Sequence, residues 1–324
     1  MNFKQFQQGF LEDLENTSFV SAPENLYQPF HYIMQLGGKR LRPTALLMSV
    51  DTFGGDVLHA KDAAMAIEVF HNFTLVHDDI MDEAPLRRGK DTVHMKYDVN
   101  TAILSGDVML IDSYDRLFKY AEHPQFAAIV KCFNDAARLV CEGQQLDVDF
   151  EQREDVQEAE YLKMIEWKTA VLFAAGLKIG ALLAEATLEQ ANLIYEYGIN
   201  AGLAFQIQDD ILDSFGDPEK FGKKVGGDII QGKKTLLVIT ALDRLAGADR
   251  DGFMSLINSQ AEDEVQKVES VKSIFVDQGV VDYAEGVKKA FRSKADAALD
   301  RLRDDFPKVE AFDALTQYLL GRAV

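Results

Sequence analysis

The sequence has little cysteine and is short of basic residues. Only Cys132 and Cys141 occur among 324 residues, which excludes a disulfide framework and the cysteine spacing of a zinc site. Acidic residues outnumber basic ones by 53 to 34, so the formal net charge is −19. A surface this acidic repels phosphate backbones and anionic lipids, so we expect no nucleic-acid partner. We expect the two thiols to lie in a reducing cytoplasm.

The sequence also lacks a long uncharged apolar run. Its most apolar segment, residues 169–186, has Lys178 in the middle and Glu185 near the end, so we expect a buried helix there and no membrane span. The opening stretch MNFKQFQQGFLEDLENTS has no apolar core of a signal peptide. Alternating β-branched runs long enough for a sheet are absent too.

Helical periodicity dominates the chain instead. Prolines fall mainly between the periodic segments, and no glycine- or serine-rich linker divides them. We predict an all-α fold, a single domain over residues 1–324, with ten or more helices around a central cavity. The predicted helices lie at roughly Phe3–Glu15, Leu26–Gln35, Thr44–Phe53, Lys61–Met81, Thr101–Ala121, Gln125–Phe150, Ala159–Leu183, Glu189–Phe215 and Thr235–Leu245, with several more to Leu320.

Two nearly identical acidic clusters follow apolar helical segments. HDDIMD at 77–82 recurs as QDDILD at 208–213. On a helix the outer aspartates of each cluster share one face, where they destabilise the helix and raise one another's pKa. Oxygen ligands with no cysteine favour a hard ion such as Mg²⁺, which shares its shell with substrate phosphates. A solvated acidic patch could explain one cluster, but two copies favour a magnesium site. The aspartates are Asp78, Asp79 and Asp82, then Asp209, Asp210 and Asp213.

Basic residues beside glycines flank both clusters. They are Lys39, Arg40 and Arg42 in GGKRLRP, Arg87 and Arg88 in PLRRG, Lys223 and Lys224 in FGKKVGGD, and Lys233 and Lys234 in QGKKT. Arginine makes forked contacts to phosphate and lysine acts as a point charge, so these loops could hold a polyphosphate. None is a Walker loop, and any one alone could be a solvated loop. Further donors on the long helices are His71, Lys168, Thr169 and Gln206.

The order of these motifs resembles that of the trans-isoprenyl diphosphate synthases, the polyprenyl synthetase family. The sequence has, in order, GGKRLRP, HDDIMDEAPLRRG, GQQLD, KT, FQIQDDILD and FGKKVGGDIIQGKKT. A single DDxxD is a weak signature, whereas six ordered motifs over nearly the full length are specific. The resemblance implies an orthogonal helical bundle around a deep cavity, usually as a homodimer.

The resemblance also implies roles for individual residues. Magnesium ligands, for three ions that Mn²⁺ can replace, would be Asp78, Asp79, Asp82, Asp209, Asp210 and Asp213. The isopentenyl diphosphate site would be Lys39, Arg42, His71 and Arg88. The allylic diphosphate would be held by Arg87, Lys168, Lys223 and Lys233. The carbocation would be stabilised by Thr169 and Gln206.

The reaction implied is the head-to-tail condensation of isopentenyl diphosphate with dimethylallyl, geranyl or farnesyl diphosphate. Magnesium and cationic side chains would stabilise the departing diphosphate, so that the allylic carbon–oxygen bond ionises. The double bond of isopentenyl diphosphate then attacks, and a proton is lost to the released diphosphate. No side chain in the motifs is suited to be that base.

The residues before the first cluster bear on product length. Phe73 lies five positions before Asp78, where family members that stop early often carry an aromatic residue, and Phe70 lies one turn above Thr74. The DDIMD motif has no insertion. We therefore predict a short all-trans product, C20 slightly ahead of C15, and expect Phe73→Ala, alone or with Phe70→Ala, to lengthen it. Both phenylalanines could instead be ordinary core residues.

Three other functions remain open from the sequence. A class I terpene cyclase is also an all-α magnesium enzyme, but its second metal motif is of the N-S-E type, whereas this chain has DDILD. A non-catalytic partner subunit should have lost one metal motif. The third is a longer-chain polyprenyl diphosphate synthase.

Overall fold

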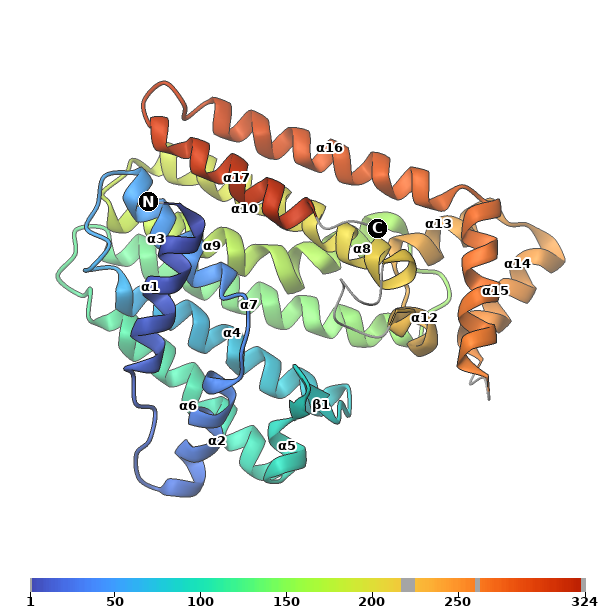
Figure 1. Cartoon of the computed structure of the whole chain (residues 1–324), viewed down its shortest axis with the longest axis horizontal. Coiled ribbons are helices and arrows are strands. Elements are labelled where there is room, and N and C mark those ends of the chain that lie inside the picture. The colour runs from blue at the N-terminus through green and yellow to red at the C-terminus, as the bar shows by residue number, and fades with distance from the viewer. Residues whose placement is uncertain (1, 217–224, 260–262, 322–324) are drawn as a thin grey trace. The chain divides into compact units, whose positions relative to one another are not determined.

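The structure of the chain is a computed structural model in which residues 2–216, 225–259 and 263–321 are described (Figure 1). The described residues are almost entirely helical, with one two-stranded antiparallel sheet among them, so the all-α prediction is confirmed. Among these residues no helix has both the length and the apolar character that crossing a bilayer requires. The chain divides into two compact units, which we describe separately. The single domain and its central cavity stay predictions.

The first unit comprises Met1–Ala136, Leu172–Tyr195 and Leu302–Ala311. Its helices are α1 (Phe3–Glu15), α2 (Glu24–Gln35), α3 (Leu41–Thr52), α4 (Lys61–Met81), α5 (Val93–Lys96), α6 (Val99–Phe118), nearly all of α9 (Val171–Leu183) and a 3₁₀ turn at Pro307–Val309. A hairpin of β1 (Leu86–Arg87) and β2 (Lys90–Asp91) follows α4. The second unit comprises Ala137–Val171, Glu196–Arg301 and Phe312–Val324. Three further helices are divided between the units: α7 (Phe126–Glu151), α10 (Leu188–Phe215) and α17 (Glu310–Leu320).

Helix α4 lies in the core of the first unit, beside α6 (Figure 1). Most of its residues are buried, as expected for a helix with apolar residues around much of its surface. Near its end the ring of His77 lies against Gly106 of α6, where a Cβ would be 2.3 Å from Nε2 of the histidine. Only glycine permits this close approach. The contact fixes the end of α4 at the point where the first acidic cluster begins.

The second unit is built around α13 (Leu236–Arg244), which is buried from Leu236 to Leu242. Thr235 caps its first turn, with the hydroxyl accepting from the backbone N–H of Val238. Four helices pack against it and shield its apolar surface from water. They are α8 (Glu158–Ile165), α14 (Gly247–Asn258), α15 (Glu264–Asp277) and α16 (Val280–Asp300). The short helix α12 (Gly227–Gln231) packs on α15 (Figure 1).

Two local structures differ from the helices predicted above. The segment expected to be one helix from Ala159 to Leu183 contains a π-helical turn at Glu166–Ala170. The loop after α4 contains the β1–β2 hairpin, with Arg87 paired to Lys90. Each difference falls on a predicted site motif, KT and PLRRG respectively.

Candidate active site

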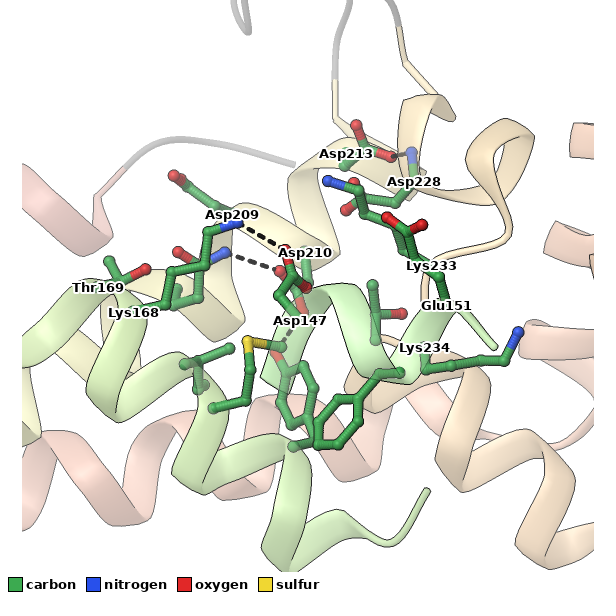
Figure 2. Close-up of a pocket in the computed structure, with 16 residues that line it drawn as sticks. Asp147, Glu151, Lys168, Thr169, Asp209, Asp210, Asp213, Asp228, Lys233 and Lys234 are labelled. Carbon is green, nitrogen blue, oxygen red and sulfur yellow. Dashed lines mark hydrogen bonds and ion pairs between the residues drawn. The ribbon is translucent and has the colours of Figure 1, made fainter. Parts of the chain in front are cut away.

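A cavity of about 270 Å³ in the second unit collects much of the predicted site (Figure 2). It is lined by the end of α7, by α8 with the π-helical turn, by the second half of α10 and by the stretch that begins at Asp228. The predicted residues that it brings together are Lys168, Thr169, Gln206, Asp209, Asp210, Asp213 and Lys233. Lys223 lies outside the described residues.

The KT motif lies on the π-helical turn, which α7 supports directly. A Cβ at Gly143 would be 2.3 Å from the backbone nitrogen of Lys168, so glycine is required for α7 to pass this close. One turn later Asp147 accepts from Lys168 Nζ at 2.6 Å. The GQQLD and KT motifs therefore form one structural element. π-Helical turns occur frequently at functional sites, and this one carries both Lys168 and Thr169.

The aspartates of the second cluster have different environments (Figure 2). Asp210 is buried, and its two oxygens accept from the Tyr161 hydroxyl and, at 3.1 Å, from Gln206 Nε2. Burial, reinforced by the neighbouring Asp228 carboxylate, raises the pKa of Asp210 well above its usual range. Asp209 is half-buried and lines the cavity.

Asp213 positions the segment that follows the cluster. Its Oδ2 accepts from the backbone N–H of Asp228 at 3.0 Å, and its carbonyl accepts from Gly226 at 2.6 Å. Asp228 and Lys233 both line the cavity, and the Lys233 N–H donates to the Asp228 carbonyl at 2.9 Å. The second half of α10 thus holds the lysine-bearing segment through backbone contacts.

In the first cluster, which lies in the first unit, one aspartate is again buried and its neighbour is half-buried. Asp79 is 1% exposed, and Arg87 Nε donates to both of its oxygens at 2.8 and 2.9 Å. Burial raises the pKa of Asp79, an effect that the Arg87 guanidinium opposes. Asp78 is half-buried, with Oδ2 at 3.7 Å from Arg87 Nη2, and Asp82 is exposed as the C-cap of α4.

Both clusters lie where helix dipoles disfavour them. Helices α4 and α10 carry their aspartates in or near the last turn, and neither last turn has a basic residue. A carboxylate there faces the negative end of the dipole, at a cost of about 0.3–1 kcal/mol each. A bound cation removes this cost, so the donor set fits a divalent metal. Within the described parts of the chain no three acidic, histidine or cysteine side chains converge enough to hold an ion unaided.

A group of cationic residues lies near the start of α3 in the first unit. Arg42 Nη1 is 3.2 Å from His71 Nε2, and Arg88 Nη1 donates to the Leu36 carbonyl at 3.1 Å. Burial and, next, the charge of Arg42 lower the pKa of His71 well below its usual value, so the ring is neutral and can accept from Arg42. Burial also lowers the pKa of Arg88, to about 10. Lys39 is exposed on the preceding loop.

The aromatic residues before the first cluster form a stack. Phe70 and Phe73 have ring centroids 5.4 Å apart, and Phe73 lies edge-on to His77 at 4.8 Å. Phe133 of α7 extends the stack, 5.2 Å from Phe70. Thr74 is half-buried, and its hydroxyl donates to the carbonyl of His71 at 2.8 Å.

Comparison with known proteins decides the family. The family model described as polyprenyl synthetase matches residues 23–275. The chain belongs to the polyprenyl synthetase family. It is 38% identical over 306 residues to the geranylgeranyl diphosphate synthase of Methanosarcina mazei, covering 94% of this chain and 91% of that one. It is 36% identical over 325 aligned positions to the geranylfarnesyl diphosphate synthase of Natronomonas pharaonis, covering 94% and 92%.

Solved structures agree with this assignment. The crystal structure of a geranylgeranyl pyrophosphate synthase superposes with a TM-score of 0.93 at 44% identity, covering 100% of both chains. The predicted helical bundle and the predicted class of enzyme, a short-chain trans-prenyltransferase of isoprenoid biosynthesis, are confirmed.

Several residues of this polyprenyl synthetase were missed as site residues by sequence reasoning. Asp147 belongs to GQQLD, so its motif was visible in the sequence, but its ion pair with Lys168 was not. Asp228 follows two glycines in FGKKVGGD, a signal that could have identified it. Tyr161 carries no local signal, because its contact with Asp210 spans 49 residues. Phe133 carries none either, because it contacts Phe70 from a different helix.

Proposed function

We propose that this prenyltransferase condenses isopentenyl diphosphate with allylic diphosphates to an all-trans C20 product, assisted by Mg²⁺. The observation that carries the proposal is the second unit's cavity, in which Asp209 faces the same space as Lys168 and Lys233. A carboxylate that can bind a metal ion and ammonium groups that can bind phosphate, placed in one cavity, suit a metal-bound diphosphate. The geranylgeranyl diphosphate synthases among the relatives favour C20, although a geranylfarnesyl diphosphate synthase is also among them.

The metal ligands proposed are Asp78 and Asp82 of the first cluster and Asp209 of the second. Arg87 engages both oxygens of Asp79, and Tyr161 with Gln206 engages those of Asp210, so these two aspartates support the ligands beside them. Asp213 supports the site through the Asp228 backbone. We propose three Mg²⁺ ions, which Mn²⁺ can replace. When bound, they would neutralise the charge that develops on the departing diphosphate.

Two groups of cations would hold the substrates. Lys168 and Lys233 line the cavity of the second unit and would bind the allylic diphosphate, together with Lys223. The isopentenyl diphosphate would be bound in the first unit by Lys39, Arg42, His71 and Arg88. The neutral His71 ring orients the Arg42 guanidinium, and a neutral ring adds no charge to be desolvated.

Thr169 and Gln206 would stabilise the carbocation. Gln206 donates its amide N–H to the Asp210 carboxylate, which fixes the orientation of its side chain. The amide oxygen is then the atom that can face positive charge. Thr169 lines the same cavity and offers a hydroxyl oxygen. Apolar neighbours such as Met164 and Ile165 in the lining would limit access of water to the cation.

A homodimer is the assembly we propose. Helix α6 exposes Leu104, Ile111 and Phe118, with exposed fractions of 58%, 58% and 56%. Their spacing of seven places them in one stripe along the helix, as in helices that pack against a partner helix. An apolar stripe this exposed is expected to be covered. Ile111→Glu should convert the dimer to a monomer in light scattering, whereas an unchanged mass would contradict this interface.

We also propose a cytoplasmic location. Both cysteines are free thiols, Cys132 buried and Cys141 exposed. Burial raises the pKa of Cys132 to about 12, so it is inert as a thiol, and an exposed free thiol such as Cys141 is typical of a reducing compartment. Cell fractionation would check this.

The deciding experiment is incubation of the homogeneous protein with labelled isopentenyl diphosphate, Mg²⁺ and a C5, C10 or C15 primer, with products identified by mass. We expect a C20 diphosphate, and loss of about three orders of magnitude in turnover for Asp209→Asn. Exposed Asp149, on α7, provides the matched control as Asp149→Asn. A cyclised product formed without isopentenyl diphosphate would indicate a terpene cyclase. No turnover on any primer would indicate a non-catalytic partner subunit, and products beyond C25 a longer-chain synthase.

A further inference from the structure

Lys267 of α15 belongs to none of the motifs, yet it is among the most buried charged residues described. Its side chain lies in the core of the second unit with 4% of the residue exposed. Its ammonium donates to three backbone carbonyls: Ile230 at 3.2 Å, Ile257 at 2.8 Å and Ser259 at 2.8 Å. An ammonium has three N–H donors, and here all three are used.

The three carbonyls belong to the ends of two helices. Ile230 lies in the last turn of α12, Ile257 in the last turn of α14, and Ser259 is the C-cap of α14. Carbonyls at a helix C-terminus lack intrahelical partners and carry the negative end of the dipole. Two such ends converging on one ammonium offset the cost of removing it from water. Lys267 therefore joins α12 and α14 to α15.

The segment fastened in this way carries part of the active-site cavity. Asp228 lies on α12, and Lys233 follows Gly232, the residue that ends α12. At the start of the segment Gly226 has φ of 86°, and a Cβ there would lie 2.7 Å from Val268, the residue after Lys267. The same turn of α15 thus contacts both ends of α12.

Lys234 makes a second set of buried hydrogen bonds to the same region. Its Nζ donates to the Gly232 carbonyl at 3.1 Å and to Asn258 Oδ1 at 2.9 Å, and the residue is 7% exposed. Lys233 and Lys234 are adjacent in sequence but differ in role, because the buried Lys234 is directed to the end of α14. Two buried lysines thereby hold the backbone from which Lys233 extends.

We propose that Lys267 is a positioning residue for the allylic diphosphate, acting through α12 to hold Asp228 and Lys233 at the cavity. This inference rests on the proposed function of that cavity. Displacement of a binding group by about 1 Å can cost up to about a hundredfold in activity. Loss of Lys267 should therefore weaken binding of the allylic substrate and leave the isopentenyl diphosphate site, which lies in the first unit, unaffected.

The test compares three variants of the full chain. Lys267→Met keeps the length of the side chain and removes its donors, and Lys267→Arg keeps charge and donors. Lys272→Met is the matched control on the same helix, because Lys272 is 27% exposed and its ion pair with Glu269 is long, at 3.7 Å. For each variant KM for farnesyl diphosphate, KM for isopentenyl diphosphate and kcat are measured, together with hydrogen exchange of residues 226–235.

We expect Lys267→Met to raise KM for farnesyl diphosphate by about ten- to a hundredfold with KM for isopentenyl diphosphate unchanged. Amide exchange at 226–235 should accelerate in the same variant, Lys267→Arg should recover part of both effects, and Lys272→Met should behave as wild type. Equal changes in both KM values, or no change in a folded Lys267→Met protein, would overturn the inference. If Lys267→Met does not fold, Lys267→Gln, which keeps an amide donor, takes its place.

The outcome separates this inference from the proposed function. A wild-type protein that turns over no primer would refute the function, and the exchange rates at 226–235 would still report whether Lys267 fastens α12. An active wild type with an unaltered farnesyl diphosphate KM in Lys267→Met would refute the positioning role alone.

Discussion

Replacing Arg40 by methionine tests whether a buried ion pair, distinct from any substrate contact, holds the GGKRLRP segment. The Arg40 guanidinium pairs with Glu68 of α4 at 2.5 Å, and both side chains are 2% exposed. Its other terminal nitrogen donates to the carbonyls of Met34 and Leu36, at 2.8 and 2.6 Å. Arg40 thus joins the end of α2 to α4 from the residue before α3. The neighbours Lys39 and Arg42 are the ones proposed to meet substrate.

The structure sets the size of the expected effect. Arg40→Met leaves the Glu68 carboxylate buried without its cation, at a cost of about 3–5 kcal/mol. The Leu36 carbonyl still accepts from Arg88, whereas the charged donor to Met34 is lost, adding about 1 kcal/mol. The free energy of unfolding should therefore fall by about 4–6 kcal/mol. Domains are stable by only about 5–15 kcal/mol in total, so this is a large fraction.

Urea unfolding of Arg40→Met, Glu68→Gln and the double variant measures this coupling. The double variant should lose less free energy of unfolding than the two single variants lose in sum. We expect the difference to be at least about 2 kcal/mol, because in the double variant neither charge is left buried without its partner. Arg138→Met is the control, since its pair with Glu142 is 57% and 41% exposed and should be worth under about 1 kcal/mol. Additive effects, or a loss below about 1 kcal/mol for Arg40→Met, would refute the reasoning.

Three further predictions concern the site. Phe73→Ala should lengthen the product beyond C20 by opening the aromatic stack, and an unchanged product distribution in chromatography would show that Phe73 does not limit product length. Because the pKa of His71 is lowered in the folded protein, the unfolded chain binds a proton below about pH 6.5 that the folded chain does not. The free energy of unfolding should thus decrease as the pH is lowered below about 6.5, by up to about 1.4 kcal/mol per pH unit. His71→Asn should reduce that dependence in urea titrations at pH 7 and pH 5. Equal slopes would contradict the burial of a neutral ring. Tyr161→Phe removes a hydrogen-bond donor from buried Asp210 and should lower the free energy of unfolding by about 1–3 kcal/mol. The same variant should bind Mn²⁺ more weakly, as measured by electron paramagnetic resonance. Full Mn²⁺ affinity would show that Tyr161 does not position Asp209.

Helices whose ends depend on local signals were predicted closely. Phe3–Glu15 has the predicted bounds, because Asn2 and Gln5 form a capping box at its start. Lys61–Met81 is also as predicted, with a long apolar pattern between polar ends. These features depend on residues within a turn or two of each other, so the sequence alone expresses them.

Structures that arise from contacts between distant segments were not predicted. The π-helical turn at Glu166–Ala170 interrupts a continuous helical pattern, and it lies where Gly143 brings α7 against Lys168. The β1–β2 hairpin has strands of two residues, too short for any periodicity to show. In both cases a periodic pattern of apolar residues along the sequence does not reveal the local structure.

Sequence by itself determined the family, the helical class and part of the lining of the second unit's cavity, because motif order and the 3.6-residue period are local properties of the chain. Only the tertiary structure decided which side chains contact each of the aspartates. Asp78 and Asp79 are adjacent in sequence, but only Asp79 is engaged at both oxygens by Arg87. In the second cluster Tyr161, 49 residues away, engages Asp210. The physical reason is that burial and hydrogen-bond partners are set by packing between helices, which one-dimensional spacing does not specify.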